Sequence, residues 1–156
     1  MFFDRWGPAS LEINDTLKRV DEVDEDDGHK IFKMEVNFPW PLWNRIMIVT
    51  LYPATDLADG EQQCWFSCVG NEAMKEKHFT EDDAKNFVLA SQNIGGWLLK
   101  PIKDADGNVT GTHMMFANAA SVGGIIPDAV TNSQVPKSVA AMTQGTIAWV
   151  RKNKGS

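Results

Sequence analysis

Residues 29–38 read His-Lys-Ile-Phe-Lys-Met-Glu-Val-Asn-Phe, and this stretch decides the fold class. Ile31 and then every second residue from Phe32 to Phe38 are apolar, which is the period of a strand that places one face in a core. Pro39-Trp40-Pro41 ends the strand, because proline lacks an N–H and forces the preceding residue to be extended. The sequence therefore predicts a half-buried β-strand here.

Further strands are predicted on both sides of this one. Residues 17–24 are loosely strand-like and lead into an acidic turn at 25–28. Residues 45–52 and 64–69 predict the third and fourth strands, since both are rich in bulky and β-branched side chains. Residues 72–83 are interpreted as loop with some helix, because Thr80 can cap a helical turn.

The next apolar segments are interrupted by two glycines. Residues 87–90 and 97–102 form either one bulged strand or two strands that break at Gly95-Gly96. Residues 104–108 then make a tight turn into a strand at 109–118, so this pair is expected to be a hairpin.

The C-terminal part changes from period two to helical spacing. Its apolar stripe predicts one amphipathic helix face, formed by Val135, Val139, Met142, Thr143, Thr146, Ile147 and Val150. Pro136 is expected to start or kink this helix, and Gly145 to weaken its middle. The fold class is therefore α+β: a curved antiparallel sheet of about six strands packed on a long C-terminal helix.

Size and charge limit the function classes. The chain has 156 residues and a mass of 17.3 kDa, which predicts a single domain over 1–156. Fifteen basic against twenty-one acidic residues give a net charge of −6 with no basic stripe, so nucleic acid is not an expected partner. No apolar run approaches the ~20 residues that cross a bilayer, so we expect no transmembrane span.

The N-terminus and the cysteines indicate the compartment. Residues 1–6 lack the apolar core of a signal peptide, so we expect an intracellular protein, cytoplasmic or organellar, that is not secreted. Cys64 and Cys68 lie four apart on a predicted strand, about 13 Å at ~3.3 Å per residue, beyond the ~7 Å limit for a disulfide. They are expected to be free thiols, as in a reducing compartment.

The sequence carries no constellation typical of an enzyme. His29, His78 and His113 are scattered, and no His or Cys pair has the spacing of a metal site. The acidic stretch 104–108 contains oxygen ligands, but Met115 stands where a calcium loop needs its final glutamate. Phosphate-loop and nucleophile motifs are missing as well. We therefore expect no catalysis, no metal and no cofactor.

Several weak motifs, taken in order, are similar to those of one family. They are Trp6, residues 20–24, residues 38–45, residues 86–90 with 96–102, and residues 123–132. In this order the chain resembles the StAR-related lipid transfer (START) domains of the helix-grip superfold. The resemblance implies a curved sheet gripping a long C-terminal helix, with a tunnel for one sterol, phospholipid or other apolar molecule and no covalent chemistry.

The chain also departs from the family pattern. Arg45 is followed by Ile46 where the family has Arg-Asp, a cavity arginine of some members falls at or near Leu51, and the aspartate before the last helix aligns with Ser121. The family's N-terminal helix and first strands have no counterpart before Phe2, so the domain is expected to be N-terminally truncated. An open sheet edge would then need a cover: a second copy, another polypeptide or a large assembly.

The expected ligand-binding residues lie on the inner faces of the strands and of the last helix. They are Met34, Val36, Arg45, Trp97, Leu99, Met115, Val139, Met142 and Ile147. Apolar periodicity leaves two interpretations open, because the same residues form either a ligand cavity or a tightly packed core. Arg45 either meets a ligand head group or pairs with Glu35.

Two functions follow from these interpretations. The first is non-catalytic binding of a lipid or sterol-like ligand between the sheet and the helix. The alternative is an accessory subunit whose remnant fold docks on partner proteins, including a membrane complex. The aromatic segments 2–6 and 39–43 motivate this alternative.

Overall fold

The structure is a computed structural model that describes residues 5–38, 42–68, 72–121, 123, 124, 126 and 128–153. Within these ranges, side chains at 91–93, 120, 128, 129, 131, 134 and 135 are not described. The predicted strand stop at 39–41 and the Val135 position of the helix stripe therefore lie outside the described parts.

The chain alternates short helices with a long run of strands. In order, the elements are α1 (Trp6–Ile13), β1 (Leu17–Asp26), β2 (His29–Val36), β3 (Arg45–Leu51), β4 (Thr55–Asp56), a 3₁₀ turn η2 (Ala58–Gly60), β5 (Gln62–Ser67), α2 (Glu72–His78), α3 (Glu81–Asn86), β6 (Val88–Lys103), β7 (Val109–Ser121) and α4 (Asp128–Lys152). The predicted strands and the hairpin are confirmed, with boundaries that move by a few residues.

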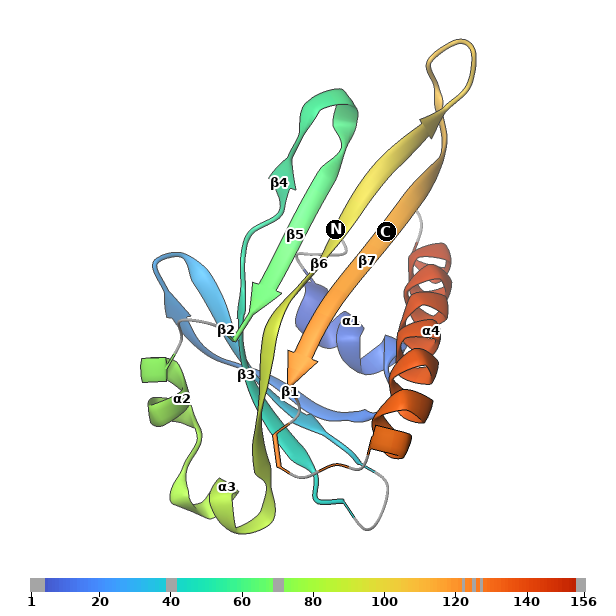
Figure 1. Cartoon of the computed structure of the whole chain (residues 1–156). Coiled ribbons are helices and arrows are strands. Elements are labelled where there is room, and N and C mark those ends of the chain that lie inside the picture. The colour runs from blue at the N-terminus through green and yellow to red at the C-terminus, as the bar shows by residue number, and fades with distance from the viewer. Residues whose placement is uncertain are drawn as a thin grey trace.

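The strands form one open sheet (Figure 1). Their order is β1-β2-β3-β5-β6-β7, with the two-residue β4 paired to β5, so the sheet has seven strands where about six were expected. The pairs are antiparallel except for a short parallel contact of residues 45–47 with 88–90. The α+β class, with a mostly antiparallel sheet and a C-terminal helix, is confirmed.

Alternation along β2 gives the sheet an inner and an outer face. On the inner face, Phe32 stands opposite Val49 and Met34 opposite Met47; on the outer face, Lys33 stands opposite Ile48. Because successive side chains of a strand point to opposite sides, the whole even-numbered apolar set of β2 enters one core. The inner core also contains Cys64, Phe66 and Trp97.

Two glycines that the sequence left as a possible strand break lie inside the continuous sixteen-residue β6. Gly95 is opposite Phe66 and Gly96 is opposite Trp65 on β5. A Cβ on Gly95 would lie 2.3 Å from the Phe66 ring, and one on Gly96 would lie 2.5 Å from the Trp65 ring. The glycines therefore make room for aromatic rings from the neighbouring strand, and the bulge falls between residues 92 and 94.

Helices α1 and α4 lie together on the inner side of the sheet (Figure 1). Trp149 of α4 packs against Ala9 and Ile13 of α1. A Cβ on Gly145 would lie only 2.4 Å from the backbone oxygen of Ile13, so the two helices cross where α4 has no side chain. Because α1 in turn packs against β1, it lies between the end of α4 and the sheet.

The predicted details of the last helix need correction. It begins at Asp128 rather than at Pro136, which lies inside it. Among its described side chains, Thr146 and Trp149 are buried, whereas Val139, Ile147 and Val150 of the expected apolar stripe are exposed. The buried stripe is rotated because α4 packs on α1 at Gly145, a contact that the sequence pattern did not reveal.

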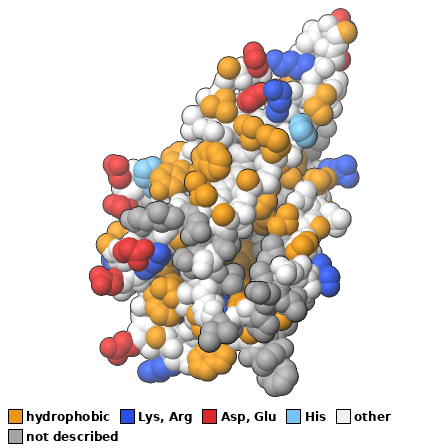
Figure 2. All heavy atoms as spheres, viewed as in Figure 1, with side chains coloured by type: hydrophobic (Ala, Val, Ile, Leu, Met, Phe, Trp, Pro, Cys, Tyr) orange, Lys and Arg blue, Asp and Glu red, His pale blue; other side chains and the backbone are white. Residues whose placement is uncertain are grey.

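The outer face is covered only in part. Ile31, Ile46 and Ile48 pack beneath Met74, Phe79 and Phe87, which come from α2, the α2–α3 connection and the end of α3. Hydrophobic side chains gather uncovered on the face over β5, β6 and β7 (Figure 2). They include Trp65, Ile94 and Met115, each more than a third exposed.

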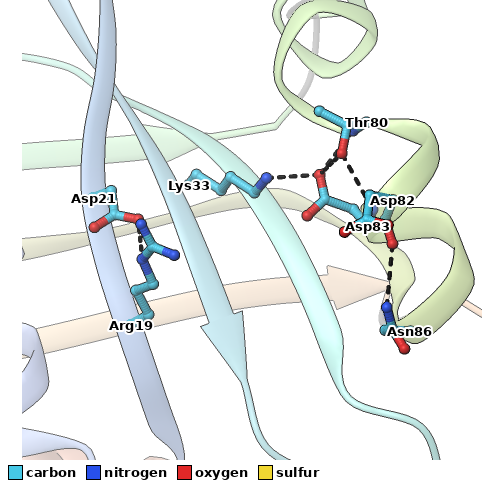
Figure 3. A network of polar contacts seen from close by, with 7 residues as sticks. All are labelled: Arg19, Asp21, Lys33, Thr80, Asp82, Asp83 and Asn86. Atoms are coloured by element: carbon cyan, nitrogen blue, oxygen red, sulfur yellow. Dashed lines mark hydrogen bonds and ion pairs between the residues drawn. The ribbon is translucent and has the colours of Figure 1, made fainter.

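An ion pair ties α3 to the outer face. Lys33 Nζ of β2 lies 2.6 Å from Asp83 Oδ2, and Asp83 forms a capping box with Thr80 at the start of α3 (Figure 3). The expected helix cap at Thr80 is confirmed. Burial alone would raise the pKa of Asp83, but Lys33 and the hydrogen bonds from Thr80 outweigh it and lower the pKa.

Substitution of Gly145 tests the helix crossing. Alanine improves helix propensity by about 1 kcal/mol, but its Cβ cannot fit beside the Ile13 oxygen without moving the helices apart. We expect Gly145→Ala to lower the free energy of unfolding by about 1–3 kcal/mol, the usual cost of overpacking. The measurement is urea unfolding, with Gln144→Ala on the exposed side of α4 as control; a stabilised Gly145→Ala would contradict the close crossing.

The Lys33–Asp83 pair predicts a pH dependence of stability. The pKa of Asp83 is lower in the folded chain, so the pair stabilises above the unfolded pKa of about 3.9 and the stabilisation is lost as pH falls through the folded pKa. We expect the free energy of unfolding, measured in urea, to fall less between pH 6 and pH 3 for Asp83→Asn than for wild type. Asp82→Asn, at an exposed carboxylate paired with Lys85, should keep the wild-type pH profile; identical profiles for all three chains would refute the role of the pair.

Candidate ligand-binding hollow

Trp6 occupies the centre of the inner face. Its indole ring lies 5.3 Å from the ring of Phe32, 5.9 Å from that of Phe66 and 6.2 Å from that of Trp97, measured between centroids. Only 5% of its surface is exposed. The first turn of α1 brings it there, because a Cβ on Gly7 would lie 2.8 Å from the Phe32 ring and the helix backbone approaches β2 closely. The Trp6 ring therefore covers the middle of the inner face of the sheet.

A hollow of about 310 Å³ lies beside Trp6. Its lining comes from the strands of the sheet, including Phe32, Leu51 and Cys64, from the start of α1, and from the segment after β3. The lining residues are Trp6, Gly7, Pro8, Glu22, Gly28, Lys30, Phe32, Leu51, Tyr52, Pro53, Ala54 and Cys64. Mostly apolar walls with few polar groups, at about the lower limit of 300 Å³, are typical of small-molecule sites.

The polar groups of the hollow are already partnered. Lys30 Nζ lies 2.8 Å from Glu22 Oε2, both side chains are about half exposed, and the hydrogen bond to Glu22 raises the pKa of Lys30. The Cys64 thiol donates to the Tyr52 carbonyl at 3.3 Å, and the Tyr52 ring packs edge-on against His29 at 4.8 Å. The interior is therefore apolar, with one ion pair exposed to solvent.

Arg45 is buried away from this hollow. It is 3% exposed, its guanidinium donates to the carbonyls of Trp43 and Gly123, and it lies 4.6 Å over the Phe38 ring. Burial lowers the pKa of Arg45. Glu35, the alternative partner considered from the sequence, stands opposite Ile46 in the register, so alternation directs its side chain to the other face. These contacts tie the end of β7 to β3.

The predicted site residues are only partly brought together. Met34 and Trp97 belong to the inner core, with Val36 packed against it. Leu99 and Met142 are half-buried, and Val139 and Ile147 on α4 are exposed. None of the nine predicted residues lines the hollow.

Met115 is on the wrong face. In the register, Trp97 pairs with Phe116 and Leu99 with Met114, so Met114 and Phe116 belong to the inner face. Met115 pairs with Leu98 on the outer face and is 51% exposed. The prediction that Met115 faces the interior fails because its neighbours Met114 and Phe116 are also apolar, which hides the alternation.

Sequence reasoning missed α1 and therefore missed the hollow. Trp6, Ala9 and Ile13 have helical spacing and form the buried side of α1, which is the signal that could have identified it. The other lining residues come from a hairpin, a strand end and a loop. No sequence pattern joins them, because only the tertiary fold brings these segments around one space.

Among the described residues, no three histidine, cysteine or acidic side chains converge on a possible metal site. In the acidic stretch 104–108, Asp104 accepts hydrogen bonds from the backbone N–H groups of residues 106 and 108. In the acidic strand β1, Asp24 forms ion pairs with Lys77 and His78. Neither cysteine forms a disulfide, as predicted, and both are buried. No helix in the described part is long and apolar enough to cross a membrane.

The fold is similar to that of solved structures of START-related lipid transfer proteins. Human STARD10 superposes with a TM-score of 0.67 at 15% identity over 97% of this chain, and the human StarD13 (DLC2) lipid transfer and protein localization domain with 0.61 at 17% over 91%. The STAR-related lipid transfer protein fragment 25–204 from Xanthomonas axonopodis gives 0.64 at 18% over 94%. The resemblance inferred from the sequence is confirmed at the level of the fold. No family model and no curated protein sequence matches this chain.

The chain is shorter than these structures. It spans 59% of STARD10, 65% of the StarD13 domain and 75% of the bacterial fragment.

The environment of Cys64 predicts low thiol reactivity. Burial raises the pKa of the thiol to about 11, so at pH 8 the thiolate is about a hundredfold rarer than in an ordinary cysteine. We expect native protein at pH 8 to react with a thiol reagent far more slowly than urea-unfolded protein, at both Cys64 and Cys68. Peptide mapping after alkylation measures each site, and fast native labelling of Cys64 would contradict its burial.

Proposed function

We propose that this protein binds one small apolar or amphipathic molecule, without catalysis, in the hollow beside Trp6. The observation that carries the proposal is the hollow itself: about 310 Å³ walled by Trp6, Phe32, Leu51 and Cys64 on the inner face of a START-like sheet. Such walls exclude water from an apolar ligand, and their burial on binding is favourable at roughly 25 cal/mol per Å².

The comparisons support the ligand class. The StarD13 domain and the bacterial protein are both named for lipid transfer. At ~30 Å³ for each water-sized group, the hollow holds about ten such groups. This volume fits one short chain or ring system better than a complete two-chain phospholipid. The ion pair of Glu22 and Lys30 at the rim offers a charged contact for a polar end.

The lining of the hollow supports ligand binding without covalent chemistry. Two of its titratable groups are Cys64, whose pKa is raised by burial, and Glu22, which forms an ion pair with Lys30. A protonated thiol and a paired carboxylate are not activated for reaction. An intracellular location and docking to a larger assembly remain predictions from the sequence.

A substitution at the rim tests the proposal with little risk to the fold. Ala54 lines the hollow yet is exposed, so Ala54→Trp adds a side chain that fills the space without overpacking the core. We expect wild type to carry about one apolar molecule per chain by native mass spectrometry, and Ala54→Trp to lose at least nine-tenths of this occupancy.

Ala105→Trp is the matched control, because Ala105 is equally exposed at the β6–β7 turn and lies far along the chain from the lining residues. It should retain wild-type occupancy, and circular dichroism should show the same fold for all three chains. Equal occupancy of wild type and Ala54→Trp, or a wild-type chain that neither carries an apolar molecule nor binds anilinonaphthalene sulfonate, would refute binding in this hollow.

A further inference from the structure

Glu22 and Lys30 form the charged part of the rim of the hollow. Among the described residues that line the hollow, only these two carry a charge. They reach the same face of the sheet from neighbouring strands, because Glu22 stands opposite Phe32 and Lys30 stands opposite Leu51 in the register. Phe32 and Leu51 belong to the inner core. The ion pair therefore borders the hollow from the inner face of the sheet.

The ion pair keeps unused hydrogen-bonding groups. Lys30 Nζ donates to Glu22 Oε2 at 2.8 Å, and neither side chain has another hydrogen bond to the part of the chain that the structure describes. An ammonium group carries three donors, and a carboxylate has two acceptor oxygens. Two N–H groups of Lys30 and the Oε1 atom of Glu22 are therefore available to a ligand, next to each other at the rim.

The mouth of the hollow is open beside this pair. Gly28 lines the hollow in the turn between β1 and β2, and a Cβ placed on it would meet no atom within 4 Å beyond its chain neighbours. The side chains of Lys30 and Glu22 are 48% and 45% exposed, whereas Trp6 and Phe32 farther inside are each 5% exposed. A bound amphiphile therefore keeps its polar end at the rim and its apolar part inside.

The ion pair disfavours a charged polar end. A carboxylate bonded to Lys30 would face the negative charges of Glu22 and of Glu25, which stands opposite Lys30 on β1. An ammonium group bonded to Glu22 would face Lys30. Either ion meets a like charge or displaces one member of the pair, and both outcomes weaken binding. A hydroxyl donates to Glu22 Oε1 and accepts from Lys30 Nζ at once, so it leaves the ion pair intact.

We propose that the ligand of this hollow is an uncharged amphiphile with a hydroxyl end, whose apolar part has about ten non-hydrogen atoms and whose hydroxyl bridges Glu22 and Lys30. The inference rests on the proposed function, because it assigns the polar end of a molecule that is bound beside Trp6. It makes Glu22 and Lys30 specificity-determining residues. Their two charges balance each other, and removal of either one leaves the opposite charge in excess.

Binding of matched probes at neutral pH tests the inference. Nonanol, nonanoate and nonylammonium share one alkyl chain length and differ in the charge of the polar end. Methyl octyl ether is an isomer of nonanol that accepts a hydrogen bond but donates none. We expect isothermal titration calorimetry of the full chain to show that nonanol binds about tenfold more tightly than either ion and about threefold more tightly than the ether.

Single substitutions should change the preference in opposite directions. Glu22→Gln leaves the charge of Lys30 unbalanced and should make nonanoate the tightest probe, whereas Lys30→Met leaves Glu22 and should make nonylammonium the tightest. The ion pair of Lys100 Nζ with Glu61 Oε1 does not line the hollow and provides the matched controls. Glu61→Gln and Lys100→Met should keep the wild-type order of affinities. Circular dichroism and urea unfolding check that each variant retains the fold.

The outcomes separate this inference from the proposed function. If nonanol does not bind, or binds Ala54→Trp as tightly as wild type, binding in the hollow fails and the inference fails with it. If Ala54→Trp abolishes nonanol binding but an ion or the ether binds wild type as tightly as nonanol, only the hydroxyl end is overturned. An unchanged order of affinities in both Glu22→Gln and Lys30→Met would overturn the role of the ion pair.

Discussion

The packing of Trp6 against Phe32, Phe66 and Trp97 is the contact on which the rest of the structure depends. It fixes the first turn of α1 on the inner face. Ala9 and Ile13 of α1 pack against Trp149 of α4, and the α1 backbone at Ile13 lies close to Gly145 of α4. The C-terminal part of α4 is therefore held in place through α1. An aromatic side chain of this size, almost fully buried, contributes several kcal/mol, which is a large share of the stability of a small domain.

This arrangement explains how a chain that spans 59% of STARD10 still encloses an inner core. Trp6 fills the centre of the sheet and leaves a small hollow beside it, while apolar groups of α4 such as Val139 and Ile147 stay exposed. The hollow is a consequence of one open sheet with a single well-packed centre.

The sequence was sufficient to predict those parts of the structure that local periodicity determines. The alternation of β2, the turn before β7 and the cap at Thr80 are short-range features, and each was predicted correctly. The class of fold followed from their order. The resemblance to START domains depended on weak motifs, and the superposition bears it out even though sequence identity is only 15–18%.

The sequence predictions failed where a contact with a segment distant in the sequence determines the local structure. Gly95, Gly96 and Gly145 were interpreted as breaks or weak points, but Phe66, Trp65 and the Ile13 backbone occupy the space that they leave. Met115 was assigned to the inner face because apolar neighbours hide the period of β7. The hollow was missed because a space between four segments leaves no pattern in any one of them.

Hydrogen exchange of Trp6→Ala compared with wild type tests the central dependence most directly. If Trp6 holds α1 and α1 holds α4, the opening free energy of amides in both helices should fall together by about 3 kcal/mol or more, while β2 and β3 stay protected more strongly than the helices. If α4 keeps its wild-type protection while α1 opens, α4 is held by other contacts and does not depend on Trp6.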